Sequence, residues 1–177
     1  MYFKKLIGKK CYLSPIDVND VEKFTEWLND MELLKYFSLY PNIISLENER
    51  ETLIKLSKEH NYSIIDSETN ELIGNCGFFD IDQINHTAEI GIFIGNKTFW
   101  NKGYGTEALS LLIDYGFKAL NFHNIMLRVY ENNRGAVRCY GKIGFKIIGK
   151  RREALHRDLE TQNILYMDIL SNDFYKK

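Results

Sequence analysis

A chain of 177 residues in which 45% are hydrophobic and 27% are charged has ordinary globular composition and enough length for one cored domain. Its net charge of −1 excludes a strong field for nucleic acid, and no stretch approaches the ~20 apolar residues of a membrane span. The 3 cysteines and 4 histidines are too dispersed for a metal-ligand spacing or an evident disulfide set. We therefore expect one domain over residues 1–177, in a reducing cytoplasm, without a metal.

The first half of the chain alternates strand signals with helix signals. Val21, Phe24 and Leu28 recur at helical spacing after a turn at 14–17, which predicts a helix. The segment 67–71 has the composition of a hairpin turn between two strands. The elements expected in this half are strands over 10–15, 62–66, 72–80 and 88–94, helices over 18–28 and 45–58, and a helical turn over 30–37.

The second half begins with the clearest helix of the chain, directly after Gly105. Its apolar stripe consists of Ala108, Leu109, Leu112, Ile113, Phe117 and Leu120. A strand over 125–130, a helix over 133–143 and a closing hairpin over 146–154 and 163–170 follow. This element order predicts an α+β fold, with a mixed, mostly antiparallel sheet of about seven strands and helices on both faces.

The junction between the strand over 88–94 and this helix carries two glycines, Gly103 and Gly105, beside Lys102. Backbone N–H groups and the positive end of the helix dipole at such a junction favour a phosphate or pyrophosphate. Glycine leaves the backbone open to close approach by the anion. The loop is therefore a candidate anion site.

The same glycines permit a second interpretation, as a dinucleotide-binding fingerprint. Gly103, Gly105 and Ala108 satisfy its spacing, and Glu131 follows roughly where a ribose-binding acid could sit. In that fingerprint, however, the strand runs directly into its first glycine, whereas residues 95–102 intervene here. A glycine-rich turn without a ligand is a third alternative, and the loop alone does not decide among them.

A second segment, residues 133–145, decides between these interpretations. It reads Asn-x-x-Ala-x-x-x-Tyr-x-Lys-x-Gly-Phe, matched by Asn133, Ala136, Tyr140, Lys142, Gly144 and Phe145. Together with the glycine loop, this pattern resembles the GNAT superfamily of acetyl-CoA-dependent N-acetyltransferases, nearest its ribosomal-protein N-terminal and spermidine acetyltransferase branch. The resemblance implies the GNAT fold, in which two strands splay apart to admit acetyl-CoA, and transfer of acetyl to a primary amine. Trp100 departs from the family, which usually has Gln or Arg at that position.

The resemblance also implies roles for individual residues. Tyr140 is the expected general acid at the thioester sulfur, although a tyrosine here could merely pack; a positioned acid typically contributes about 10²–10⁴-fold. Asn133 is expected to bond the pantetheine arm, with a plain helix cap as the alternative. Glu89 is a candidate general base or else a solvated carboxylate. Backbone N–H groups near Ile92 to Ile94, in the same strand, could line an oxyanion site or pair with pantetheine. The expected cofactor-binding residues are Ile92, Phe93, Ile94, Asn101, Lys102, Gly103, Tyr104, Gly105, Thr106, Asn133, Ala136 and Tyr140.

The acceptor amine has no diagnostic motif. Glu22, Glu26, Asp30 and Glu32 make the first helical region acidic, which either attracts a cation or forms a solvated face. The segment 36–44, expected on the acceptor side, contains no acid. At pH 7, deprotonating an α-amine costs about 1 kcal/mol and a lysine-type amine nearly 5 kcal/mol. We therefore expect a peptide or protein N-terminal α-amine; the alternatives are a spermidine-type polyamine and a CoA-binding module without catalysis, and a homodimer is expected from the family only.

Overall fold

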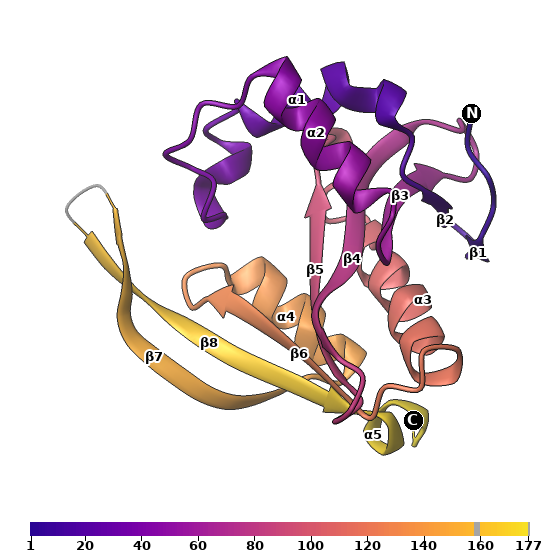
Figure 1. Ribbon diagram of the computed structural model, residues 1–177. Coiled ribbons are helices and arrows are strands. Elements are labelled where there is room, and N and C mark those ends of the chain that lie inside the picture. Colours follow the sequence, from indigo (N-terminus) through magenta and orange to yellow (C-terminus); the bar gives the residue numbers. More distant parts are fainter. Residues whose placement is uncertain (158–159, 177) are drawn as a thin grey trace. The chain divides into compact units, whose positions relative to one another are not determined.

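The computed structural model describes residues 1–157 and 160–176, and in these residues eight strands form one sheet (Figure 1). They are β1 (Leu6–Ile7), β2 (Cys11–Pro15), β3 (Asn61–Asp66), β4 (Leu72–Asp82), β5 (Thr87–Ile94), β6 (Asn124–Tyr130), β7 (Lys146–Arg157) and β8 (Glu160–Leu170). Their order is β1-β2-β3-β4-β5-β6-β8-β7. β5 pairs with β6 in parallel, whereas β1–β2, β2–β3, β3–β4, β6–β8 and β7–β8 are antiparallel. The predicted fold class is confirmed, with one strand more than expected.

The helices follow the predicted ranges closely. The α-helices of the described residues are α1 (Val21–Leu28), α2 (Leu46–Leu56), α3 (Tyr104–Lys118), α4 (Arg134–Ile143) and α5 (Ser171–Tyr175). Short 3₁₀ turns are η1 (Val18–Asp20), η2 (Leu33–Tyr36) and η3 (Lys97–Phe99). The Ser45 and Asn133 side chains cap α2 and α4 by accepting from the backbone N–H groups of Asn48 and Ala136. β1, η3 and α5 were not predicted, because elements of two to five residues are too short to show a period.

The chain folds into two compact units, each formed by two separate stretches of sequence. Unit 1 comprises residues 1–77 and 92–112, and unit 2 comprises residues 78–91 and 113–177. β4, β5 and α3 contribute residues to both units. No helix in the described part of the chain is long and apolar enough to span a membrane.

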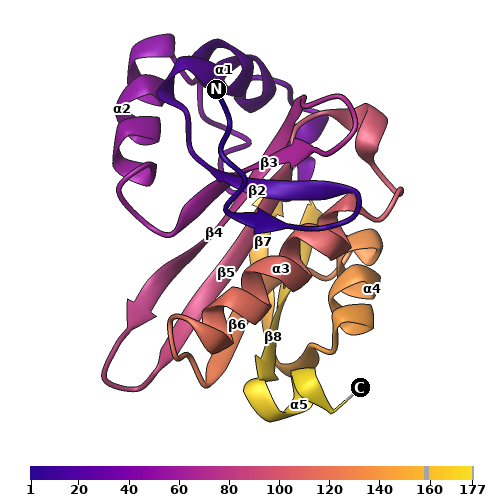
Figure 2. The same cartoon turned by 90° about the vertical axis from the view of Figure 1, so that its right-hand side faces the viewer.

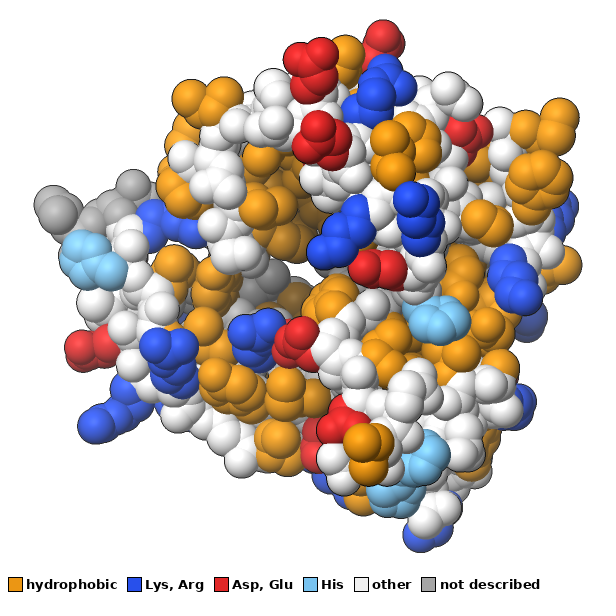
Figure 3. Space-filling view, viewed as in Figure 1, with side chains coloured by type: hydrophobic (Ala, Val, Ile, Leu, Met, Phe, Trp, Pro, Cys, Tyr) orange, Lys and Arg blue, Asp and Glu red, His pale blue; other side chains and the backbone are white. Residues whose placement is uncertain are grey.

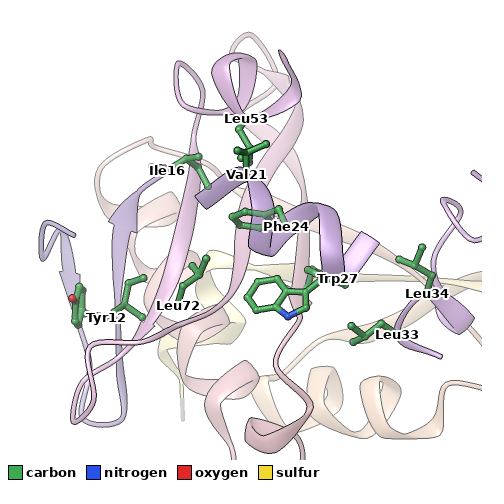
Figure 4. Close-up of a cluster of buried hydrophobic side chains, with 11 residues drawn as sticks. Tyr12, Ile16, Val21, Phe24, Trp27, Leu33, Leu34, Leu53 and Leu72 are labelled. Carbon is green, nitrogen blue, oxygen red and sulfur yellow. The ribbon is translucent and has the colours of Figure 1, made fainter. Parts of the chain in front are cut away.

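The core of unit 1 lies between the helices α1 and α2 and one face of its strands (Figure 4). α1 buries Val21, Phe24 and Trp27, the stripe expected from its spacing except that Trp27 replaces the half-buried Leu28 as the deepest residue of its last turn. α2 contributes Leu53, which is fully buried, whereas its Leu46 and Ile54 are exposed. The cluster is completed by Tyr12, Ile16, Leu33, Leu34, Ile65, Leu72 and Phe93.

The opposite face of these strands is buried as well. Successive strand residues point to opposite faces, so Ile92 and Ile94 lie on the other side from Phe93, which belongs to the α1–α2 cluster. A Cβ atom on Gly105 would lie 3.6 Å from Ile92 Cδ1, which places the start of α3 on this second face. The stripe residues of α3 within unit 1 are buried, as predicted: Ala108, Leu109 and Leu112. Helices therefore cover both faces.

Unit 2 is built around the β7–β8 hairpin, which runs longer than predicted on both arms (Figures 1 and 2). Its register shifts between Arg151 and Leu155, so the hairpin contains an irregularity at the point where the expected first arm ended. The part of α3 in unit 2 packs closely against β4, because a Cβ on Gly116 would lie 2.6 Å from Phe78 Cζ. Ile113 and Phe117 are buried as expected, but Leu120 lies beyond the end of α3 and is only half-buried.

Candidate active site

The predicted site residues fall into two groups, one in each unit. Ile92–Ile94 and 101–106 belong to unit 1, whereas Glu89 and the α4 residues belong to unit 2. Within unit 1, the structure brings Gly105 against Ile92 and Ile94. The two groups are therefore described separately, unit by unit.

The glycine loop of unit 1, residues 100–106, joins η3 to α3 through two left-handed residues. Asn101 has φ of 57° and Gly103 has φ of 88°. Left-handed residues next to a helix start turn successive N–H groups toward one side, which is the arrangement of an anion-binding nest. The first bond of the α3 ladder runs from Glu107 N to Gly103 O (3.0 Å), so the N–H groups of 104–106 lie outside that ladder. The loop therefore fits the phosphate groups of coenzyme A.

Two side chains fix the ends of the loop. Trp100 Nε1 donates to the carbonyl of Ile94 (2.9 Å), so this residue ties the loop to the end of β5. The departure of Trp100 from the usual Gln or Arg thus has a structural use. The Tyr104 hydroxyl donates to Asp66 Oδ1 (2.8 Å), and this hydrogen bond raises the pKa of Tyr104 to about 12. The loop is therefore anchored to β5 and to the end of β3.

The β1–β2 turn also holds the loop, through contacts that the sequence did not reveal. Glu107, in the first turn of α3, accepts hydrogen bonds from the backbone N–H groups of Lys9 (2.8 Å), Lys10 (2.8 Å) and Cys11 (3.1 Å). These bonds keep the pKa of Glu107 below its usual value against the opposing effect of burial. Lys10 Nζ donates to the carbonyl of Lys102 (2.9 Å). Glu107 is 96 to 98 residues away from its three partners, so no local motif could have indicated the contact.

The α4 helix of unit 2 carries its candidate residues on one face. Asn133, Ala136 and Tyr140 are spaced by three and four residues, so they lie above one another along the helix. Asn133 Oδ1 accepts from Ala136 N (3.2 Å), which makes the side chain a helix cap. Its amide nitrogen is not used by that bond and can still donate. Gly144 ends the helix with φ of 118°, a left-handed conformation that favours glycine.

Tyr140 is packed on one side and has an unpaired hydroxyl among the described residues. Its ring packs edge-on against Phe145, with 6.0 Å between ring centroids, and the residue is half-buried. Burial, followed by the neighbouring Cys139 thiol, raises the pKa of Tyr140 well above its usual value. The hydroxyl makes no hydrogen bond to any other residue that the structure describes. The phenol thus stays protonated at neutral pH.

Glu89 is buried, at 7% exposure, and is paired with an arginine. Arg128 Nε on β6 donates to Glu89 Oε1 (2.7 Å), and this bond raises the pKa of Arg128. The alternative of a solvated strand-end carboxylate is therefore wrong. The bond to the Arg128 guanidinium holds the Glu89 carboxylate in one orientation.

Glu131, the candidate ribose-binding acid of the dinucleotide interpretation, is committed to the hairpin. Its Oε1 pairs with Lys150 Nζ (2.5 Å) and its Oε2 accepts from Asn163 Nδ2 (2.6 Å). Arg151 and Arg152 follow on β7 as exposed residues, and Figure 3 shows Lys and Arg side chains over this part of the surface. The run of basic residues 150–152 is thus an exposed part of β7. Glu131 is already paired, so the dinucleotide interpretation loses its candidate ribose-binding acid.

A cavity of about 300 Å³ in unit 2 contains none of the predicted site residues. Its lining comes from the β4–β5 turn, the end of α3, the loop after it and α5, and consists of His86, Phe117, Lys118, Asn121, Phe122, His123, Ser171 and Tyr175. Among the described residues, no three His, Cys, Asp or Glu side chains gather in a group that could hold a metal ion.

Comparison with known proteins gives one consistent family. The profile of the acetyltransferase (GNAT) domain matches residues 10–146. The uncharacterized N-acetyltransferase p20 of Bacillus licheniformis is 31% identical over 97% of this chain and 96% of its own length. Spermidine N(1)-acetyltransferase of Escherichia coli is 25% identical over 92% of this chain and 87% of its own. The crystal structure of spermidine N-acetyltransferase from Vibrio cholerae, in complex with CoA and spermine, superposes with a TM-score of 0.83 at 24% identity, covering 94% of this chain and 99% of that one.

Proposed function

The chain belongs to the GNAT family of acetyl-CoA-dependent acetyltransferases, and we propose that its acceptor is the N-terminal α-amine of a peptide or protein. The profile match and the N-acetyltransferase relatives confirm the predicted family, the enzyme class and the acetyl donor. We also propose that residues 1–177 act as one domain in the cytoplasm, where Cys11, Cys76 and Cys139 would stay reduced.

The acetyl donor brings a thioester carbonyl, and the chain must hold it, free the acceptor amine and protonate the departing sulfur. We assign the phosphates of the donor to the glycine loop, because its left-handed Asn101 and Gly103 and the start of α3 offer backbone N–H groups. The neutral amine forms the new C–N bond as the C–S bond breaks. Tyr140 then gives its proton to the thiolate, a role that its uncommitted hydroxyl supports, and the proton that leaves the new amide nitrogen restores the phenol through solvent.

Glu89 is the proposed base that frees the amine, and the bond from Arg128 holds its carboxylate in one orientation. An α-amine asks less of a base than a polyamine does, since its deprotonation at pH 7 costs about 1 kcal/mol against nearly 5 kcal/mol. The α-amine is therefore the acceptor that is easier to deprotonate.

The main observation behind the α-amine proposal is that unit 1 has few unpaired acids in its first helical region. Lys97 Nζ pairs with Asp30 Oδ2 (2.8 Å) and with Glu32 Oε2 (2.5 Å), so two of the four acids in the first helical region share one lysine and are already paired. Glu22 and Glu26 remain on α1 as exposed residues. The segment 36–44 adds no acid. A polyamine, with two or more charges to balance, would find few unpaired carboxylates in this part of unit 1.

A further acid, Glu49 on α2, was not anticipated from the sequence. It is buried at 4% exposure, although it lies in a helix that also carries Glu47. Burial raises the pKa of Glu49 to about 7, so the group is only partly charged at neutral pH. It therefore adds little negative charge for a polycation.

A polyamine of the spermidine type is the second candidate acceptor. The Escherichia coli relative bears the name spermidine N(1)-acetyltransferase and aligns with 92% of this chain. A CoA-binding module without catalysis is a third candidate, and the retained Tyr140 argues against it.

The test is thiol release from acetyl-CoA with N-terminal peptides and spermidine side by side at pH 7. The expected result is a higher kcat/KM for the best peptide, and loss of activity when its α-amine is blocked while a lysine remains. Lys97→Gln provides a matched arm: it frees Asp30 and Glu32, so spermidine use should rise by about two- to fivefold, the range of exposed ion pairs. A spermidine kcat/KM about tenfold above the best peptide would overturn the acceptor and leave the enzyme class intact.

A further inference from the structure

Lys10 lies against the glycine loop, although it belongs to the β1–β2 turn, 92 residues before Lys102 in the sequence. Its Nζ donates to the carbonyl of Lys102 (2.9 Å) and lies 5.7 Å from the centre of the Tyr104 ring. Its Cε is the nearest heavy atom to the position a Cβ would take on Gly103, at 4.0 Å. The Lys10 side chain thus contacts or approaches three consecutive residues, 102–104.

We propose that Lys10 supplies positive charge to the phosphates of the acetyl donor, as a positioning residue outside the sequence motif. An ammonium group has three N–H donors, and the bond to Lys102 uses one of them. The remaining donors and the positive charge lie beside the loop, well inside the ~8–10 Å over which charges act in physiological salt. This inference rests on the assignment of the phosphates to the glycine loop made under the proposed function.

Glu107 gives a physical reason for a cation at this place. Its carboxylate lies in the first turn of α3 and stays ionised, since three backbone N–H groups lower its pKa. A fixed negative charge beside a phosphate site weakens anion binding unless a cation offsets it. The same turn that binds Glu107 through its backbone N–H groups delivers the Lys10 side chain to the loop.

Lys9 is the matched control for Lys10. Both residues donate a backbone N–H to Glu107, and both side chains are exposed. The Lys9 ammonium makes no contact with another residue in 1–157 or 160–176, whereas the Lys10 ammonium is bonded to the loop. Lys9→Met and Lys10→Met therefore remove the same charge and keep the same backbone bonds, and they differ only in the contact with the loop.

The experiment measures steady-state kinetics of the full-length variants with acetyl-CoA and with S-acetyl-N-acetylcysteamine, a donor without phosphate. Lys10→Met should raise KM for acetyl-CoA about fivefold with kcat unchanged, and the effect should shrink as salt is added. Lys10→Arg should restore KM, and Lys9→Met should leave it unchanged. The phosphate-free donor should respond to neither substitution.

Two results would overturn the role of Lys10: equal KM changes in Lys9→Met and Lys10→Met, or equal losses with both donors, which would mark a structural effect. Gly105→Val separates this failure from failure of the loop assignment. Loss of acetyl-CoA binding in Gly105→Val, with no effect of Lys10→Met, would reject Lys10 alone. Retained binding in Gly105→Val would reject the loop itself and Lys10 with it.

Discussion

The glycine loop in unit 1 and the α4 helix in unit 2, the two regions that we propose to bind the acetyl donor, offer different chemical groups. The loop offers backbone N–H groups, and its side chains, such as Trp100 and Tyr104, are used to anchor it. α4 offers side chains, above all the Tyr140 hydroxyl, on an ordinary capped helix. A backbone site depends on the absence of Cβ atoms, whereas a side-chain site depends on the identity of one functional group. The two regions should therefore fail differently when mutated.

The largest effect is expected at Gly105. A Cβ there has room within the protein, with Ile92 Cδ1 at 3.6 Å and Ile94 Cγ1 at 4.0 Å, so the fold should tolerate a small side chain. Gly105→Val should nevertheless abolish the stabilisation by acetyl-CoA, which in the parent is about 2.7 kcal/mol at 100 times Kd. Gly103→Val should do the same, with added strain from its φ of 88°. Thermal unfolding with and without acetyl-CoA measures this, and binding equal to the parent would show that the loop is wrongly assigned.

The next effect concerns the side-chain region. Tyr140→Phe removes only the hydroxyl, so acetyl-CoA affinity should persist while kcat falls by about 10²-fold, the usual loss for a positioned acid. Tyr175→Phe is the matched control, because it removes the same atom from a residue outside the predicted site. Calorimetric titration gives the affinity and thiol release gives kcat. If kcat is unchanged with a good acceptor, Tyr140 only packs.

A smaller effect should show how the side-chain region depends on its neighbours. If Glu89 is the base, Arg128→Gln should lower kcat, by less than Tyr140→Phe does, because the carboxylate loses the bond that fixes its position. Asp80 and Tyr166 also act electrostatically on Arg128, so Asp80→Asn serves as a control for the general loss of charge. Glu89→Gln should lower kcat at least as much as Arg128→Gln. A kcat equal to the parent's in both variants would leave the ion pair with a structural role alone.

The smallest effect separates a glycine of α4 from those of the loop. No atom lies within 4 Å of a Cβ built on Gly141, and its φ is not left-handed. Gly141→Ala should therefore stabilise the protein by ~1 kcal/mol, the helix propensity difference, with acetyl-CoA binding unchanged. Denaturant unfolding measures the gain. A loss of binding in this variant would mean that α4, too, needs an open backbone.

The two regions also differ in how far the sequence could describe them. Local periods predicted α3, α4 and most strands within a few residues, because amphipathic spacing and caps are read from neighbours in the chain. The positions of Gly103 and Tyr140 followed from motifs for the same reason. The partners of these motifs did not: Glu107 binds the β1–β2 turn, Arg128 binds Glu89, and each contact joins residues 39 or more positions apart. Tertiary packing sets such contacts, and no local pattern encodes them.

The burial of individual side chains was the other property that the sequence did not predict. Glu49 has the surroundings of a solvated helix residue in the sequence, yet it lies at 4% exposure with its pKa raised to about 7. Leu46 and Ile54 of the same helix are apolar, yet both are exposed. A helix of mixed charge and few apolar residues does not show which face the core will take.

The most direct test of the site is an amide NMR titration of the ¹⁵N-labelled protein with acetyl-CoA. We expect the largest shifts at the amides of 101–106, with a second group at Asn133, Ala136 and Tyr140. The amides of His86 and Lys118, which line the cavity of unit 2, should stay in place. Largest shifts at that cavity, with the loop amides unchanged, would contradict the assignment of the glycine loop as the phosphate site.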